Sequence, residues 1–346
     1  MDMHRQTRII GVLLLCLAGA AVQAGTALFE SEIVVSDQSP QVRNAALDGA
    51  LREILVRVTG QPDVLNSEAA RSLLASSQQL VQQYRYFTES GKEPPLLKLW
   101  VRFDGAAIRQ ALQQQGVAYW GGERPDTLVW LAVEDRGNRY VVAPGEGGDV
   151  YREVEAAGRS RGVPLIFPLM DLEDQTRVRF ADIWGGYTAT VISASQRYSP
   201  PAILIGRLNR TASGGWAARW QLEMGGRRHA WSDTHPELAA LAGQGINELA
   251  GLQAAQLAVT TPDAAGSDIV ITVDGINDLA AYARTGNYLA ALSAVRSVQL
   301  DEASGAAIHY RLQLNGNLQD LERTVAVGSM LEPVRDGMAG HFRLRQ

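Results

Sequence analysis

The chain has 346 residues, 46% of them hydrophobic and 20% charged, which is enough for two or three domains that each bury a core. Its formal net charge is −5, and this acidic balance argues against a general nucleic-acid binder, because phosphate contacts need a basic face. Beyond the first 24 residues, no segment is long and apolar enough to be predicted as a transmembrane helix.

Residues 1–24 are predicted to be a cleaved secretory signal peptide. Arg5 and Arg8 form a basic head, a short apolar run follows, and small residues precede the expected cleavage after Ala24. Release into the periplasm is therefore expected. Lipidation of Cys16 is the alternative, and the apolar run that continues beyond this cysteine argues against it. Loss of Cys16 with the peptide would exclude disulfides, thiolate metal sites and a cysteine nucleophile.

Residues 25–120 are predicted to form a small α+β domain. Its main helix has apolar residues four apart, with Pro40 just ahead of it and Gly60 just after it. Asp104 is placed to cap the last helix. The expected order is strand, helix, helix, strand, strand and helix, at residues 28–35, 39–60, 67–83, 84–87, 96–103 and 105–116.

Residues 125–259 are predicted to form an α/β domain with antiparallel strands at one edge. The stretch "TLVWLAV" is almost continuously apolar, as is typical of a strand buried on both faces. Gly225 and Gly226 separate two alternating stretches, which predicts a hairpin. The expected strands are 127–133, 164–169, 202–208, 216–224 and 227–233, and the expected helices are 149–161, 184–198 and 235–259.

Residues 266–335 are predicted to form a third, ferredoxin-like domain with the order βαββαβ. Turn-forming and small residues at 260–267 indicate a linker before it, and residues 336–346 are predicted to be a tail. Gly286 interrupts the first helix of this domain and is expected to weaken it. The whole chain is therefore expected to be a multidomain protein of α+β and α/β units.

Four phrases occur in order along the chain: "RNAALDGALREILVRVTG", "RPDTLVWLAVED", "RGVPLIFPLMD" and "YLAALSAVRSVQL". Together they resemble a family of exported gammaproteobacterial proteins catalogued as domain of unknown function 2066 (DUF2066). The resemblance implies export but no catalytic residue and no cofactor, because that family has no established activity. The middle segment is also similar in element order to exported α/β modules that assist envelope assembly, including activators of cell-wall synthases.

The stretch from Gly158 to Gly162 has the G-x-S-x-G letters of a hydrolase nucleophile elbow, with Ser160 at its centre. Asp171 or Asp174, and then His229 or His235, follow in the order that a hydrolase triad would need, an order that arises easily by chance. An elbow serine lies on a turn between a preceding strand and a following helix, whereas this stretch ends a predicted helix and precedes a predicted strand. We therefore expect no catalytic serine.

A metal site is the hypothesis for His229, Asp233 and His235, which occur within the short stretch "RHAWSDTH". The alternative is a hairpin end followed by a helix start, with Asp233 or Thr234 as the cap and His235 beyond the bend. His309 is expected to be a cross-strand neighbour rather than a ligand. We expect no metal ion, and no cofactor motif such as a P-loop or a dinucleotide fingerprint occurs in the sequence.

Carboxylates follow the expected strand at 164–169, the end of an α/β strand at which ligands commonly bind. Three interpretations fit these carboxylates: an acid/base pair, a calcium site or a solvated loop. Acidic loops are common, so we expect the loop. Two aromatic residues nearby flank a pair of glycines, which suits contact with a glycan or peptide as well as a buried anchor. The candidate binding residues are Asp171, Asp174, Asp182, Trp184 and Tyr187.

Export, the modular order and the lack of a credible catalytic constellation favour a non-catalytic module of the cell envelope. We expect it to bind, or to assist the assembly of, a periplasmic protein partner. A periplasmic hydrolase is the alternative, and so is a protein that binds the glycan of peptidoglycan through the region of Asp171 and Trp184.

Overall fold

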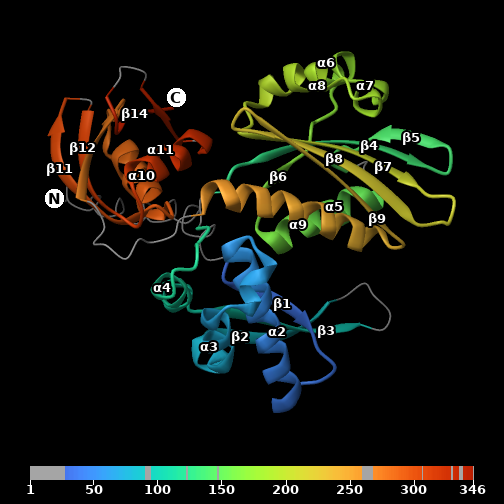
Figure 1. Ribbon diagram of the computed structural model, residues 1–346, viewed down its shortest axis with the longest axis horizontal. Coiled ribbons are helices and arrows are strands. Elements are labelled where there is room, and N and C mark those ends of the chain that lie inside the picture. Colours follow the sequence, from blue (N-terminus) through green and yellow to red (C-terminus); the bar gives the residue numbers. More distant parts are fainter. Residues whose placement is uncertain are drawn as a thin grey trace, which may run out of the picture.

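The protein is described by a computed structural model. Its described residues are 28–89, 95–121, 124–145, 148–258, 268–305, 307–328, 330–334 and 338–345. They form three β-sheets and ten α-helices, which is the mixed α+β architecture expected for a multidomain chain (Figure 1). The predicted signal peptide and the predicted linker lie outside the described residues. Among the described helices, none is both long and apolar enough to span a membrane.

The first sheet contains three antiparallel strands in the order β1-β3-β2. Its strands are β1 (Glu30–Val34), β2 (Val81–Glu89) and β3 (Leu96–Phe103), and its helices are α2 (Pro40–Thr59), α3 (Glu68–Ala75) and α4 (Gly105–Gln114). Helix α2 begins where the Ser39 hydroxyl accepts the Val42 amide and ends at Gly60, whose φ of 75° continues the chain out of the helix. Asp104 caps α4, as predicted.

The helix predicted at residues 67–83 is shorter than expected. Helix α3 ends at Ala75, a 3₁₀ turn (Ser77–Leu80) follows, and β2 starts at Val81. The Ser76 hydroxyl donates to the Ser72 and Leu73 carbonyls, so a local side-chain bond replaces the next helical turn.

The central sheet has the strand order β5-β4-β7-β8-β9, with a short strand β6 beside β4. Strands β6 and β7 run parallel to β4, and the other pairs are antiparallel. The strands are β4 (Thr127–Asp135), β5 (Asn138–Val141), β6 (Leu165–Ile166), β7 (Ala202–Arg210), β8 (Trp216–Met224) and β9 (Arg227–His235). The expected hairpin is formed by β8 and β9.

Helices cover the two faces of this sheet unequally (Figure 1). The helices are α5 (Gly148–Arg161), α6 (Leu172–Arg177), α7 (Phe180–Gly185), α8 (Thr188–Ser195) and α9 (Leu238–Leu257). Helices α5 and α9 pack on one face, over buried residues of β4, β7 and β8. The smaller helices α6–α8 lie on the other face, where the buried cluster takes its strand residues from β4 and β7.

Two expectations for the central segment were wrong. The strand predicted at 164–169 is only the two-residue β6, because Pro164 and Pro168 on either side cannot donate to a sheet. The helix predicted at 184–198 is split between α7 and α8. Gly186 has a φ of 78°, and its N–H bonds back to the end of α7, which terminates that helix.

The third sheet has five strands in the order β11-β12-β10-β14-β13. Its elements are β10 (Asp268–Asp274), α10 (Leu279–Ala291), β11 (Val295–Ser304), β12 (Ala307–Leu314), α11 (Leu318–Val327), β13 (Leu331–Pro333) and β14 (His341–Leu344). The expected βαββαβ order is present, and α10 continues through Gly286. Strand β14 comes from the segment predicted to be a tail, pairs parallel to β10, and separates β10 from β13.

The C-terminal ends of α2 and α5 meet where three buried arginines bind backbone carbonyl groups. Arg57 Nε donates to the Ser160 carbonyl at 2.7 Å, and an Arg161 nitrogen donates to the Gly60 carbonyl at 3.0 Å. Arg124 donates to the Arg57 and Arg161 carbonyls, both at 2.7 Å. These carbonyl groups end their helices without helical partners, so the guanidinium groups supply the missing donors and join the first and central sheets.

Burial makes this arginine cluster electrostatically costly. Desolvation lowers the pKa of Arg124 to about 9 and that of Arg161 to about 10, and repulsion between the neighbouring arginines acts in the same direction. The Trp120 ring, 3.8 Å from the Arg124 guanidinium carbon, offsets part of this cost through a cation–π contact. The cluster is therefore a structural joint that depends on its carbonyl partners.

Candidate functional site

Asp171 and Asp174 belong to one hydrogen-bonded cluster around Arg197. Asp171 caps α6 by accepting the Asp174 amide at 3.0 Å, and its two oxygens accept from Arg197 at 2.8 and 3.0 Å. The fully buried Asp174 accepts from Arg197 at 2.9 Å, from the Tyr198 hydroxyl at 2.5 Å and from the Met170 amide at 3.0 Å. The cluster thus fastens the α6 segment to the residues that follow α8.

The electrostatics of this cluster disfavour acid/base chemistry. Hydrogen bonds from Arg197, and then from the Asp174 amide, hold the pKa of Asp171 well below its usual range. Desolvation and the bond to Asp174 raise the pKa of Tyr198. At neutral pH Asp171 carries no proton to donate, and its oxygens are already engaged.

The other three candidate residues surround the turn between α7 and α8. Asp182 accepts the Arg179 amide at 2.8 Å and so caps α7. Trp184 stacks on Phe180, with ring centroids 5.2 Å apart. Tyr187 is 63% exposed. Asp182 and Trp184 each reach a cavity on the adjoining face of the central sheet.

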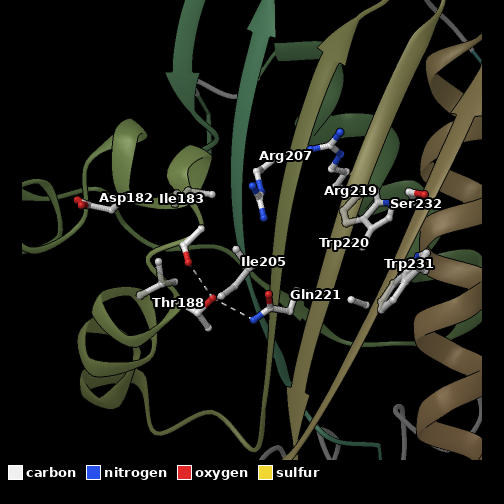
Figure 2. A pocket seen from close by; sticks show the side chains of 13 residues that line it. Asp182, Ile183, Thr188, Ile205, Arg207, Arg219, Trp220, Gln221, Trp231 and Ser232 are labelled. Carbon is white, nitrogen blue, oxygen red and sulfur yellow. Dashed lines mark hydrogen bonds between the residues drawn. The ribbon is translucent and has the colours of Figure 1, made fainter.

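These cavities form an open groove between the α7–α8 turn and the strands β7, β8 and β9 (Figure 2). Their volumes are about 330 Å³ and 560 Å³, and Arg207 and Arg219 line both. At one end Gln221 donates to the Thr188 hydroxyl at 3.1 Å and so links β8 to α8. We call this feature the arginine groove. The first cavity is also lined by the polar or small residues Asp182, Gly186, Thr188, Gln221, Ala230 and Ser232 and by the apolar residues Ile183, Val191, Ile205, Trp220 and Trp231. The second is also lined by Glu134, Arg136, Trp184, Asn209 and Arg210.

Arg207 and Arg219 lie directly opposite each other on neighbouring strands and point to the same face. On the strands that flank this pair, Arg207 lies beside Ala132 of β4 and Arg219 beside Ser232 of β9, and neither neighbour is charged. Arg207 donates to the Trp184 carbonyl at 3.0 Å. Within the described part of the chain, neither arginine forms an ion pair, and Arg219 donates no hydrogen bond. Like charges directly opposite each other destabilise a sheet, so this pair is electrostatically unfavourable by itself.

The carboxylates near the groove are engaged elsewhere. Asp182 accepts the Arg179 amide, Glu134 pairs with Arg139 at 3.2 Å, and Asp135 pairs with Arg210 at 3.1 Å. The groove therefore presents an excess of positive charge, on a chain whose formal net charge is negative.

The structure places Ser160 in the last turn of α5, followed by the short strand β6, which confirms the helix-then-strand context predicted from the sequence. Its carbonyl group accepts from Arg57, so this part of the backbone belongs to the joint between the first and central sheets. Asp171 lies at the start of α6, on the opposite face of the sheet from α5 (Figure 1). The residues that follow one another in the order of a hydrolase triad therefore do not meet in the structure.

One face of β9, the face that packs toward α9, carries every second residue of the strand: His229, Trp231, Asp233 and His235. A strand rises about 3.3 Å per residue, so His229 and Asp233 lie roughly 13 Å apart along it. The predicted bend and cap were wrong, because Asp233, Thr234 and His235 all lie inside β9 and α9 begins after Glu237. The His235 Nδ1 accepts the Glu237 amide at 3.0 Å. Within the described residues, no group of three His, Cys, Asp or Glu side chains is arranged to hold a metal ion.

His309 lies opposite Thr272 on the neighbouring strand, with its Nδ1 3.1 Å from the Thr272 hydroxyl. The expectation of a cross-strand neighbour is confirmed.

One protein family matches part of the chain. Its description is domain of unknown function (DUF8605), and it matches residues 21–121, which include the whole first sheet. The resemblance to DUF2066 was wrong, because the matching family is a different one. The phrases that carried that resemblance are parts of helices α2 and α10 and of strands β4, β6 and β11, and helix and strand patterns of this kind recur in unrelated α+β proteins. No curated protein matches the chain.

Sequence reasoning missed Arg207, Arg219 and Gln221. Two signals were present. Arg207 is a charge inside the otherwise apolar strand "AILIGRL", and Arg219 and Gln221 alternate with the tryptophans of "WAARWQLEM". Alternation places both residues on the face away from the tryptophans. The register that places Arg207 opposite Arg219 could not be predicted, because it depends on how β7 and β8 pair.

Proposed function

We propose that this protein is an exported, non-catalytic binding module of the bacterial envelope, which holds a protein partner in the arginine groove. Export rests on the basic head, short apolar run and small residues of the first 24 positions. We also propose domain boundaries near residues 120 and 260, with the third domain extended beyond residue 335 because β14 belongs to its sheet. In this arrangement the central sheet is the binding unit, and the other two sheets flank it.

The observation that carries the proposal is the positive charge of Arg207 and Arg219, which no described residue pairs, on a sheet face that the small helices leave uncovered. A charge of this kind at the floor of an open groove is available to a ligand without disturbing the fold. The volumes, about 330 Å³ and 560 Å³, lie in the range of ligand-binding clefts.

A hydrolase is less well supported. Catalysis needs a nucleophile and a base within hydrogen-bonding distance, with titratable groups free to exchange a proton. Asp171 is held ionised by Arg197. Ser160 lies in α5 on the other face of the sheet, and His229 is on the β9 face that packs toward α9. The alternative of glycan binding would use Trp184, but the ring of this residue stacks on Phe180.

Site-specific photocrosslinking in cells that naturally carry the protein tests the proposal. Benzoylphenylalanine at Ala230, an exposed position on the groove wall, should give a discrete protein adduct in the envelope fraction, and the adduct should weaken in the Arg219→Gln background. The same group at Gln244, on the exposed side of α9, is the control and should give none. Equal adducts from both positions, or none from Ala230, would contradict the proposal. A glycan adduct would favour the peptidoglycan alternative.

A further inference from the structure

We propose that the arginine groove recognises carboxylate groups, and that its occupant is an extended acidic peptide segment of the partner protein. This inference rests on the proposed function, because it assigns the ligand chemistry of the same groove. Arg207 and Arg219 are the residues that bind the carboxylates.

The first step is the electrostatic imbalance of the pair. Cβ atoms of residues directly opposite each other in an antiparallel sheet are about 4.5–5.5 Å apart, so two guanidinium groups are held within reach of one anion. A carboxylate placed between them replaces repulsion with two attractive contacts. Guanidinium groups match carboxylate geometry in bidentate fashion, and charge-assisted hydrogen bonds are the stronger class.

The second step is that the protein does not supply this anion from the residues around the groove. Asp182 and Glu134 line the cavities but bind the Arg179 amide and the Arg139 side chain. Arg207 is held in position by its bond to the Trp184 carbonyl, whereas Arg219 is exposed and donates to no described protein group. One arginine is thus positioned and the other is free to close on a ligand.

The third step selects a peptide over a small anion. The two cavities share both arginines and extend to either side of them, so a single carboxylate or phosphate would leave most of the groove empty. Small side chains, Ala230 and Ser232, border the groove on β9, which is the edge strand of the central sheet among the described residues. An extended chain can lie against β8 and β9 there, with one of its acidic side chains directed between Arg219 and Arg207.

Binding of a synthetic peptide tests this inference in the full-length processed protein. The probes are an alternating Glu-Ala peptide, the matching Lys-Ala peptide and inorganic phosphate. The Glu-Ala peptide should shift the side-chain Nε–H NMR signals of Arg207 and Arg219 and leave those of Arg57 and Arg124 unchanged. Its affinity should fall steeply with added salt, because exposed charges are screened.

Two variants make the test specific. Arg219→Gln should weaken the Glu-Ala peptide about tenfold or more, since it removes charge-assisted contacts. Arg227→Gln is the matched control, because Arg227 is an exposed arginine at the tip of the same hairpin, on the α9 side of the sheet. The affinity of this variant for the Glu-Ala peptide should stay within about twofold of wild type.

Three outcomes would overturn the inference: no binding of the Glu-Ala peptide, equal loss in both variants, or phosphate binding as tightly as the peptide. If the Ala230 crosslink forms in cells while the Glu-Ala peptide fails to bind, the groove remains a binding site and only the acidic ligand is rejected. If neither is observed, both proposals fail.

Discussion

Arginine side chains occupy two opposite environments in this protein. Arg57, Arg124 and Arg161 are buried, and carbonyl groups at the ends of two helices accept their hydrogen bonds. Arg207 and Arg219 lie on an uncovered sheet face, and among the described residues neither has a counter-charge. The same chemical group therefore joins two parts of the fold at one place and is left available to a ligand at another.

Replacing Arg124 by Met should lower the free energy of unfolding by about 2–4 kcal/mol, because several buried carbonyl groups lose a charged donor. Urea unfolding of the variant and the wild type measures the difference. Arg52→Gln, at an exposed position on α2, is the control and should change stability by less than about 0.5 kcal/mol. An Arg124 variant as stable as this control would contradict the structural role of the cluster.

Arg219→Gln should leave the stability unchanged or raise it by about 0.2–1 kcal/mol, because it removes one of two like charges that lie opposite each other. The midpoint of thermal unfolding without ligand measures this effect. A clear loss of stability would mean that Arg219 has a structural partner, and the groove would then lack a free cation.

Asp171→Asn should destabilise the protein at neutral pH and progressively less in acid. The pKa of Asp171 is depressed in the folded protein by the hydrogen bonds from Arg197, so its stabilising contribution is fully present above the unfolded pKa of about 3.9. That contribution is lost as the pH falls below this value toward the folded pKa. Urea midpoints of wild type and variant, measured from neutral pH downward, should converge. A constant difference would show that Arg197 does not stabilise the ionised carboxylate.

At the scale of elements, local signals account for most of what the sequence predicted. Helix α2 has Ser39 and Pro40 at its start and Gly60 at its end, and α4 has Asp104 as its cap. These features act on residues close to them in the chain, so they predict where the helices begin and end without knowledge of the fold. The turn at Gly225–Gly226 likewise fixed the hairpin of β8 and β9.

The elements that were missed depend on distant partners. Strand β14 has only four residues, and it becomes a strand because β10 and β13 pair with it on either side. The arginine groove is similar, since the meeting of Arg207 and Arg219 requires the register of β7 against β8. Neither pairing leaves a periodic signal in a short stretch of sequence.

The third sheet provides a test at this scale. A fragment of residues 266–346, which retains β14, should fold alone and give dispersed amide NMR signals, because the sheet has its own buried cluster that includes Phe342. The shorter fragment 266–335 lacks β14 and should give a poorly dispersed spectrum. Equal spectra from the two fragments would mean that β14 is dispensable for the fold of this sheet.

At the scale of the whole molecule, the first and central sheets are joined more firmly than the third. Buried guanidinium groups bridge α2 and α5, whereas α11 meets α9 through an exposed bond of 3.4 Å from Arg323 to the Gln256 carbonyl.

Competition for the Ala230 crosslink tests the binding role of the groove most directly. With benzoylphenylalanine at Ala230, the yield of the partner adduct in an envelope extract should fall as the Glu-Ala peptide is added and stay constant with the Lys-Ala peptide. The Arg219→Gln variant should give a low yield that neither peptide changes. An adduct that forms equally in wild type and variant, and that the acidic peptide does not displace, would contradict binding through the paired arginines.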